Sequence, residues 1–572
     1  MSLTSYVSGA LGAIARLSWL QLFGLGVAGF LGFLASLYVY LYICSEWAIS
    51  YGNLPGPDRD HWLVGNLIYL VKRQHPTPAY RAWADKYGAT GRVHGFLGSK
   101  RVYTVDPVAI SHITQHPDQW PKSQAMSIML RRMLGDGLVT VEGYDHRRQR
   151  RLLNPAFSPK AVREMAPIFY DRALALHHKF TDMIEDGASS SQLLADGDRE
   201  KLPKDAGAID VGVYTELTTL DVIGQAGFDY EFESLTTKKN ELLDAFHSAL
   251  KVMQKGAALS QLQNRFPIFD ALPTPMTKSG AISKATMNRV GDGIVNDKTR
   301  IVKQIGIDKE TDLGTSDLLS RLIHANLDPA LTAGQKMSHD EVQAQIATFL
   351  FAGSETTGIA LTWALYRLAT NPAIQTRLRK ELQTISDDQP DVDTLHALPY
   401  LEKFTREVLR MDSPVPVVAR MCVEDTVLPL GTPVRGRDGT LIDKIVLNKG
   451  TEVALALNSV NRDPAIWGPD AEVFNPDRYD NTAIPTAQVP GIYGNLMTFL
   501  GGPRNCIGWR FALAEFKIIL FVLVRSFSFA ELPSKPPIST ETVLGILRSR
   551  VIGQDGVVVP LVVRPVSSDD SA

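Results

Sequence analysis

A single thiol stands at the centre of the chemistry that this sequence can offer. Cys506 lies in the run FLGGPRNCIG, residues 499–508. Cysteine binds a metal as the thiolate, so a ligand cysteine needs hydrogen-bond donors or a helix N-terminus nearby to lower its pKa. The next segment, from Trp509 to Leu520, has the mixed polar and apolar faces of a helix, which would place Cys506 at its positive end. The run indicates a loop that presents one thiolate to a metal.

The neighbours of the thiol fit this interpretation. Gly502 and Gly508 lack a Cβ, as a backbone requires where it turns tightly and approaches a flat cofactor. Arg504 can offer its planar guanidinium to a carboxylate. The alternative is that a lone cysteine is a small buried hydrophobic residue. However, Phe499, glycine, arginine, cysteine and glycine at these five places have odds below about one in ten thousand of arising by chance, which favours the ligand.

A second constellation lies in the middle of a long predicted helix. Ser338 and Glu341 form a capping box, and the next proline lies about thirty residues further on, which predicts one long helix. Its centre reads AGSETT, where glycine and adjacent hydroxyl residues weaken helix propensity. Glu355 and Thr356 could relay protons there, in a groove left open by Gly353. The alternative is a set of polar residues on a solvated helix face.

A pair of opposite charges lies on another predicted helix. The segment from Leu398 to Met411 places Glu407 and Arg410 three residues apart on one face. Such pairs are common on helix surfaces and contribute little there. A later loop, FNPDRY, supplies a further arginine, Arg478.

Together these motifs resemble those of the cytochrome P450 family. The loop around Cys506 matches the haem-binding pattern F-x-x-G-x-R-x-C-x-G at every fixed position, AGSETT matches A-G-x-E-T, and Glu407 with Arg410 matches E-x-x-R. The resemblance covers nearly everything from Leu54 to the C-terminus. It implies a mainly α fold with a small β region, the cytochrome P450 fold, preceded by one N-terminal transmembrane helix.

The resemblance also implies a role for each motif. Cys506 would be the proximal thiolate of a haem iron, which favours O–O cleavage. Thr356 would activate oxygen and Glu355 would deliver protons. The loop residues implied to bind the haem are Phe499, Gly502, Arg504 and Gly508. The residues implied to form a buried structural lock behind the haem are Glu407, Arg410 and Arg478.

Two further arginines are expected at the haem propionates. Arg420 matches the strand that follows the E-x-x-R helix in the family. Arg150 ends the segment HRRQR, where many relatives have W-x-x-x-R, so His146 replaces the tryptophan. Imidazole can still donate a hydrogen bond, but its charge depends on pH, which leaves this propionate contact open. Arg420 and His146 could each also be an ordinary surface group.

The substrate contacts follow by analogy alone. Their apolar character suggests a lipophilic guest, although the same residues could equally belong to the core. The residues expected to contact substrate are Met126, Met129, Ala352, Val417 and Val418. Further segments resemble fungal membrane-bound members of the family, which points to oxidation of a terpenoid or other secondary metabolite.

Composition restricts the partners. The 572 residues contain 59 Lys and Arg against 61 Asp and Glu, so no basic surplus indicates nucleic acid. The three cysteines imply no disulfide framework, which fits a reducing compartment.

The N-terminal segment predicts a membrane anchor. No charged residue occurs from residue 17 to residue 45, a length sufficient for a helix to cross a bilayer. A cleaved signal peptide is the alternative, but its apolar region is shorter, about 7 to 15 residues. Pro55 and Pro57 then end the helix. We expect an anchor in residues 1–52 and a catalytic domain in residues 53–572.

The resemblance implies a monooxygenase that uses haem b and O₂. Electrons would come from a separate NADPH-dependent cytochrome P450 reductase, with cytochrome b5 as a further donor. The family's topology implies a single-pass protein of the endoplasmic reticulum whose catalytic domain faces the cytosol. Two alternatives stay open: a haem-thiolate isomerase or dehydratase that does not use O₂, and a membrane haem sensor without catalytic activity.

Overall fold

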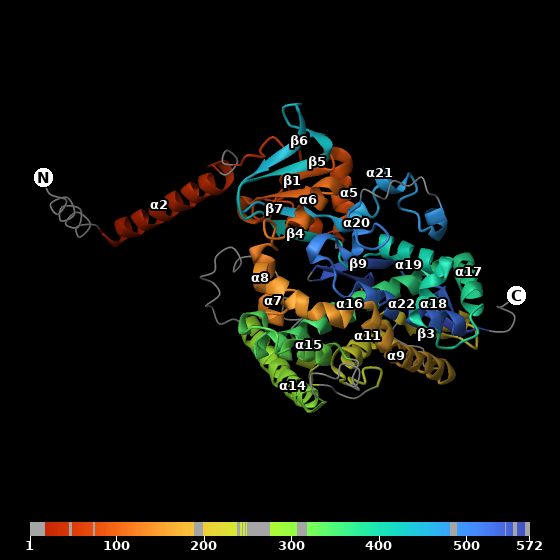
Figure 1. Cartoon of the computed structure of the whole chain (residues 1–572). Helices are drawn as coiled ribbons and strands as arrows, with labels where there is room; N and C mark the ends of the chain where they lie inside the picture. The colour runs from red at the N-terminus through yellow and green to blue at the C-terminus, as the bar shows by residue number, and fades with distance from the viewer. Residues whose placement is uncertain are drawn as a thin grey trace.

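The computed structural model describes residues 18–44, 49–72, 75–187, 198–236, 241–242, 244–245, 248, 275–305, 317–480, 489–543, 545–552 and 558–566. Helices dominate this part of the chain, and the strands form small sheets, with β1, β4, β5, β6 and β7 in the upper part of Figure 1, β9 near its centre and β3 at the lower right. The mainly α fold with a small β region is therefore confirmed.

The α-helices of the described residues are α2 (Trp19–Tyr38), α4 (Leu67–Lys72), α5 (Pro76–Tyr87), α6 (Pro107–Gln115), α7 (Gln124–Leu134), α8 (Gly143–Leu153), α9 (Pro159–Glu185), α10 (Asp198–Lys201), α11 (Val211–Phe228), α14 (Pro275–Ile305), α15 (Leu318–Leu327), α16 (His339–Thr370), α17 (Pro372–Gln383), α18 (Val392–Ala397), α19 (Pro399–Met411), α20 (Leu457–Val460), α21 (Pro464–Trp467) and α22 (Trp509–Ser526).

The strands are β1 (Thr90–His94), β2 (Lys100–Thr104), β3 (Gly207–Asp210), β4 (Val418–Met421), β5 (Thr426–Arg435), β6 (Leu441–Leu447), β7 (Glu452–Leu455), β8 (Phe527–Glu531), β9 (Ile538–Val543), β10 (Ile546–Val551) and β11 (Pro560–Pro565). The largest sheet has the order β1-β2-β7-β4, in which β2 and β7 are parallel and the other neighbours are antiparallel. The remaining sheets have the orders β3-β11-β8, β5-β6 and β10-β9.

Helix α16 forms the axis of the helical body (Figure 1). The predicted capping box is present, since the Ser338 hydroxyl accepts from the Glu341 amide and the Glu341 carboxylate accepts from the Ser338 amide, at 3.2 and 2.8 Å. Most of its side chains are buried, and α11 packs along its central part. The capping box thus starts a helix whose length and burial fix the position of its central AGSETT segment.

Two further helices, α19 and α22, position predicted site residues. Pro399 lies in the first turn of α19, where the missing amide hydrogen carries no penalty, and the helix ends at Met411 as predicted. Helix α22 begins at Trp509, directly after the Cys506 loop, and is buried along most of its length against α9 and α16. The loop is therefore anchored to the core at its C-terminal side.

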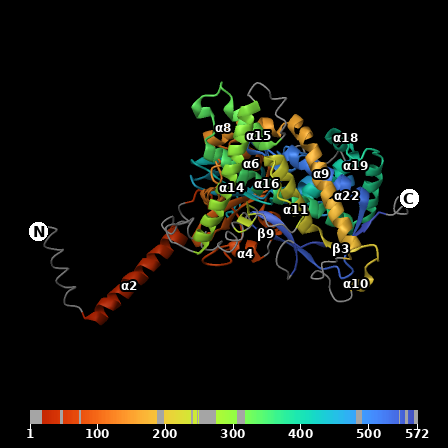
Figure 2. The same ribbon diagram turned by 90° about the horizontal axis from the view of Figure 1, so that it is seen from below.

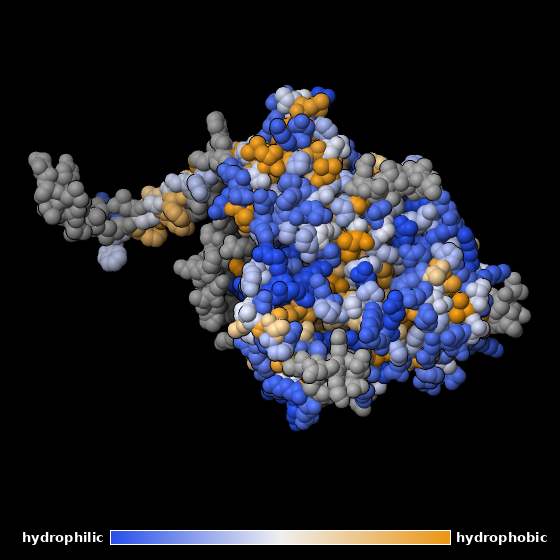
Figure 3. Space-filling view, viewed as in Figure 1, coloured by the Kyte–Doolittle hydropathy of each residue, from blue (hydrophilic) through white to orange (hydrophobic). Residues whose placement is uncertain are grey.

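The N-terminal helix lies apart from the body. Ser18 caps α2, and the π-helix η1 (Val39–Cys44) continues it, which accounts for the helix expected near residues 17–45. Figures 1 and 2 show α2 projecting away from the body, and Figure 3 shows apolar side chains exposed along it. The Tyr42 hydroxyl donates to the Trp62 carbonyl at 2.6 Å and ties the end of this segment to the body. Within the described residues, we found no helix with both the length and the apolar character of a membrane span.

Candidate functional site

One cavity brings together the Cys506 loop and the centre of α16. Its volume is about 240 Å³. Side chains from α8, α16, β4 and the start of α22 also line it. The sequence-predicted residues that line this cavity are His146, Arg150, Ala352, Thr356, Arg420, Phe499, Arg504, Cys506 and Gly508. Residues that are distant in the sequence therefore meet around one space.

The Cys506 loop is fixed by its own backbone. The Cys506 amide donates to the Phe499 carbonyl at 2.9 Å, which closes the loop. Gly502 has φ +69°, and a Cβ there would lie 2.2 Å from the Thr114 carbonyl oxygen. Gly502 therefore permits close packing against the end of α6, and its approach to a cofactor stays a prediction. At Gly508 a Cβ would meet only Phe157, at 3.6 Å, so that glycine leaves space beside the thiol.

The electrostatics of the thiol differ from expectation. Burial raises the pKa of Cys506 above its ordinary value, and the Gly508 amide and the Arg150 guanidinium lower the pKa only in part. The side chain is exposed to the cavity although it lies deep within the protein. The prediction that the loop and helix lower the thiol pKa is wrong, because α22 begins three residues later and dehydration dominates. A coordinating metal cation would itself deprotonate the thiol.

Basic groups gather at another side of the cavity. Glu142 accepts from Lys122 at 2.9 Å and also pairs with Arg504. Burial lowers the pKa of Lys122 to about 8 and that of Arg420 to about 10. The backbone of Lys122 forms an isolated antiparallel β-bridge with Arg420 of β4. The sequence analysis did not predict Lys122 at this site, because no local motif indicates a pairing between such distant residues.

This donor set fits a haem. Lys122 and Arg504 share the carboxylate of Glu142, and Arg420 lines the same dehydrated space, so the site favours a guest that brings further negative charge. The two propionates of haem b supply that charge, while the thiol of Cys506 supplies the iron ligand. The residues present thus fit both the propionates and the iron of a haem.

His146 and Arg150 take different positions on α8. Burial and the nearby bases Arg504 and Lys122 lower the pKa of His146 to about 3, so its imidazole is neutral at physiological pH. Arg150 donates to the carbonyl oxygen and the side-chain Oδ1 of Asn505, at 2.5 and 2.7 Å. Its guanidinium therefore braces the Cys506 loop, and its contact with a propionate stays a prediction.

The centre of α16 separates its two polar residues. The Thr356 hydroxyl donates to the Ala352 carbonyl at 2.7 Å and lies at the cavity. Glu355 is buried and forms an ion pair with Arg548 of β10, away from the cavity lining. Burial raises the pKa of Glu355, whereas Arg548 lowers it. A Cβ on Gly353 would lie 2.8 Å from Ile223 of α11, so this glycine also permits helix packing, in addition to the groove that we expected.

The predicted lock is buried and paired. Both side chains of the Glu407–Arg410 pair are fully buried, with Arg410 Nε 2.8 Å from Glu407 Oε2. Arg478 Nε lies 3.3 Å from Glu407 Oε1 and its other nitrogens donate to the carbonyls of Trp467 and Asp470. This network joins α19 to the loop before the Cys506 region, as the motif comparison implied.

The expected substrate contacts divide into two groups. Ala352 lines the cavity. Met126, Met129, Val417 and Val418 are half-buried and pack against the core, outside the described lining. Their contact with substrate stays a prediction.

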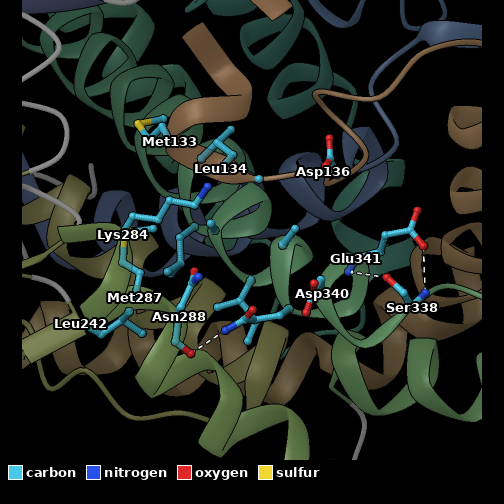
Figure 4. A pocket seen from close by; sticks show the side chains of 16 residues that line it. Met133, Leu134, Asp136, Leu242, Lys284, Met287, Asn288, Ser338, Asp340 and Glu341 are labelled. Atoms are coloured by element: carbon cyan, nitrogen blue, oxygen red, sulfur yellow. Dashed lines mark hydrogen bonds between the residues drawn. The ribbon is translucent and has the colours of Figure 1, made fainter. Parts of the chain in front are cut away.

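A second cavity lies beside α16 nearer its N-terminus. Its volume is about 380 Å³, and side chains of α7, α14 and α16 line it. Figure 4 shows Lys284 and Met287 from α14 facing Met133 and Leu134 of α7. Leu350 of α16 also lines this space, two residues before Ala352. No motif in the sequence predicted it.

Comparisons with known proteins identify the family of this chain. The family model described as Cytochrome P450 matches residues 55–552. Cytochrome P450 monooxygenase 205 of Postia placenta is 37% identical over 526 residues, which cover 90% of this chain and 92% of that relative. Cytochrome P450 monooxygenase claW of Ampulloclitocybe clavipes is 32% identical, with 90% and 92% covered. A ganoderic acid synthetase of Ganoderma lucidum is 34% identical, with 85% and 88% covered. The chain belongs to the cytochrome P450 family and is a cytochrome P450 monooxygenase.

Proposed function

We propose that this enzyme inserts one oxygen atom from O₂ into a lipophilic small molecule, held between a haem bound to Cys506 and the centre of α16. The observation that carries the proposal is the single cavity lined by both Cys506 and Thr356. A thiol on one side and a hydroxyl-bearing helix on the other supply the two halves of an oxygen-activating site.

The chain's own residues divide the work. Cys506 would ligate the iron, and Lys122, Arg420 and Arg504 would hold the propionates. The haem, when bound, supplies the activation of O₂. The Thr356 hydroxyl donates a hydrogen bond to the Ala352 carbonyl, so its oxygen lone pairs can accept a hydrogen bond and order a water in the cavity. Glu355 adjoins Thr356 in the sequence and would supply protons to the Thr356 oxygen.

The substrate class follows from the lining and from one relative. Apolar residues such as Leu138, Phe349 and Ala352 line the cavity, which favours a lipophilic guest. The relative from Ganoderma lucidum is named a ganoderic acid synthetase, which supports a terpenoid or other secondary metabolite as substrate. We infer that electrons reach the haem from a separate NADPH-dependent cytochrome P450 reductase, with cytochrome b5 as a second donor.

The same proposal places the enzyme on a membrane. Residues 1–52 would attach it, with the catalytic body on the cytosolic face of the endoplasmic reticulum. What supports this is α2, which has no charged residue and exposes large apolar side chains, among them Phe23 at 72% and Phe30 at 61%. Exposed apolar area of this kind favours contact with lipid.

Turnover with labelled dioxygen tests the reaction. The full haem-loaded chain, purified reductase and NADPH are incubated with a lipophilic extract from cells that lack the gene. We expect a product that carries one labelled oxygen atom and that is absent under nitrogen. A product that forms equally without O₂ would favour an isomerase or dehydratase instead, and no product from any extract would favour a haem sensor.

A variant pair makes the test specific to the site. Thr356→Val should reduce product per NADPH consumed by on the order of a hundredfold, because it removes the hydroxyl at the cavity. Thr370→Val, at the far end of α16, removes a hydroxyl that donates to the Tyr366 carbonyl and should leave this ratio unchanged.

A further inference from the structure

The cavity between α7, α14 and α16 combines a largely apolar wall with one basic group. The apolar part of its lining includes Met133, Leu134, Met287, Ile346, Ala347 and Leu350. Lys284 of α14 is the one basic residue among the described residues that line it. Figure 4 shows the Lys284 side chain extending from α14 toward the end of α7. An elongated apolar guest with a single polar end would match this lining.

The ammonium group of Lys284 lacks a partner within the described part of the chain. No described acid forms an ion pair with it, although the side chain is half-buried beside the cavity. A half-buried charge gives up part of its hydration, and without a partner nothing compensates this loss. Lys284 therefore favours a guest that brings a negative charge to the cavity.

Three carboxylates are also among the described lining residues, but they do not compete for this role. Glu341 pairs with Arg148 at 2.5 Å and caps the start of α16. Asp136 pairs with Arg131 at 2.6 Å. Asp340 is exposed in the first turn of α16, where water and the positive end of the helix stabilise its charge. The half-buried charge without a partner in this lining is therefore positive.

This cavity adjoins the candidate site along the same stretch of α16. Leu350 lines the first cavity, whereas Phe349 and Ala352 line the second. The segment after α7 is divided in the same way, since residues 135–136 line the first cavity and residues 138–139 line the second. A molecule that fills the first cavity can therefore reach the second by following α16.

Contacts between α14 and α16 give their relative direction. The Gln343 side-chain amide donates to the Asn288 carbonyl at 2.5 Å. Nearer the start of α16, His339 Nε2 lies 2.9 Å from Asp292 Oδ1, which is further along α14. The two helices therefore run antiparallel where they line the cavity.

This direction fixes how far Lys284 lies from the candidate site. Lys284 is one turn before Asn288, so it lies level with Ala347, which is one turn after Gln343 and also lines the cavity. Thr356 is nine residues beyond Ala347, a distance of about 14 Å along the axis of α16. An elongated guest could span the two.

We propose that this cavity binds the carboxylate end of an amphipathic acid substrate: Lys284 pairs with the carboxylate, and the apolar part of the same molecule extends along α16 to Thr356. This inference rests on the proposed monooxygenase function and names its substrate class, an apolar skeleton whose carboxylate lies about 14 Å from the carbon that reacts. Because the ion pair fixes one end of the molecule, the distance from that end decides which carbon is oxidised.

Binding can be measured without turnover. Isothermal titration calorimetry of the full haem-loaded chain compares tetradecanoic acid, tetradecan-1-ol and the tetradecyltrimethylammonium cation, which share one chain and differ at the polar end. We expect the acid to bind on the order of tenfold more tightly than the alcohol. Lys284→Gln should remove this preference without changing the affinity for the alcohol, and Lys284→Arg should keep most of it. The control Lys303→Gln, exposed in the last turn of α14, should change neither affinity.

Three results of this titration would overturn the proposal. They are equal binding of the acid and the alcohol by the wild type, tighter binding of the cation than of the acid, and an equal loss of both affinities in Lys284→Gln. Ala347→Phe tests the location, because its ring fills this cavity and should weaken the acid and the alcohol alike. Unchanged binding of the acid in that variant would place the acid elsewhere and overturn the proposal too. The carbon monoxide band of each variant shows whether the chain is folded and loaded with haem.

The position of oxidation separates this inference from the proposed function. With NADPH and cytochrome P450 reductase, tetradecanoic and hexadecanoic acid should be hydroxylated at the same carbon counted from the carboxyl group, because Lys284 fixes that end. A position that is constant from the methyl end instead would overturn the inference alone. Absence of oxygen insertion while the acid preference persists would count against the proposed function and not against the binding site.

Discussion

At the scale of single residues, basic groups gather at one side of the cavity and a thiol lies at the other. Lys122 and Arg504 share the carboxylate of Glu142, and burial lowers the pKa of Arg420 beside them. Burial also raises the pKa of the Cys506 thiol. The two propionates of a haem would offset the charge of the basic groups, and its iron would favour the thiolate form of Cys506. Binding of a haem would therefore balance the charges on both sides of this site.

The ligand assignment predicts a spectroscopic loss. Cys506→Ser should abolish the red-shifted carbon monoxide band of the reduced protein, because a serine hydroxyl replaces the thiolate at the iron. Cys422→Ser is the matched control: Cys422 is buried, its Sγ donates to the Asn448 carbonyl at 3.0 Å, and it is not among the residues that line the cavity. A retained band in Cys506→Ser would refute the assignment.

The pKa of His146 predicts a pH dependence of stability. The pKa is about 3 in the folded chain and about 6.5 when unfolded, so the unfolded state binds more protons between these values. The stability contributed by neutral His146 is complete above pH 6.5 and is lost as pH falls toward 3. In the haem-free chain, the wild type should therefore lose about 1 to 2 kcal/mol relative to His146→Gln between pH 6.5 and 5, measured by denaturant unfolding.

The same measurement with haem tests the propionate contact. A propionate beside His146 would raise its pKa and reduce the relative loss. An equal loss with and without haem would contradict that contact. Other histidines titrate in the same range, among them His75, whose pKa burial lowers to about 4, and the comparison with His146→Gln cancels their contribution.

At the scale of elements, local signals predicted the helices that carry the motifs. Ser338 and Glu341 gave the start of α16, and Pro399 gave the start of α19. Contacts between segments that are far apart in the sequence could not be predicted in this way. A capping box or a helical period concerns only residues that are close together along the chain. Arg548 comes from a strand almost two hundred residues after Glu355, and Lys122 meets Arg420 across almost three hundred residues. The sequence could single out Glu355 but could not show that Arg548 pairs with it.

The structural lock predicts a large loss of stability. Glu407→Ala should reduce the free energy of unfolding by about 3 to 5 kcal/mol, because two buried guanidinium groups lose their carboxylate. Asp477→Ala is the control. It removes the ion pair between Arg377 and Asp477, whose N–O distance of 2.7 Å is similar but whose side chains are about half exposed. That change should cost less than about 1 kcal/mol. Equal losses in the two variants would show that the Glu407 network is not a lock.

At the scale of the whole molecule, the body and α2 differ in whether their apolar side chains are buried or exposed. The body buries its apolar residues in one large cluster that surrounds α16 and α22. Helix α2 instead exposes Trp19, Phe23, Phe30 and Phe33, and Figure 2 shows it directed away from the body. Apolar area of this extent is stable in contact with lipid and not with water. The molecule thus separates the body that holds the cavity from a helix with exposed apolar side chains.

Membrane attachment through α2 predicts the effect of charge on that helix. Val27→Lys combined with Leu31→Lys places two ammonium groups one turn apart on exposed positions of α2. Each lysine among lipid tails costs about 3 kcal/mol, so the variant should be released from membranes by a carbonate wash that leaves the wild type in the pellet. The carbon monoxide band should persist, because α2 contributes no residue to the cavity lining. Val423→Lys combined with Val473→Lys adds the same charges at exposed positions of the body and should stay in the pellet. Release of the wild type by the same wash, or retention of the α2 variant, would show that α2 does not hold the enzyme on the membrane.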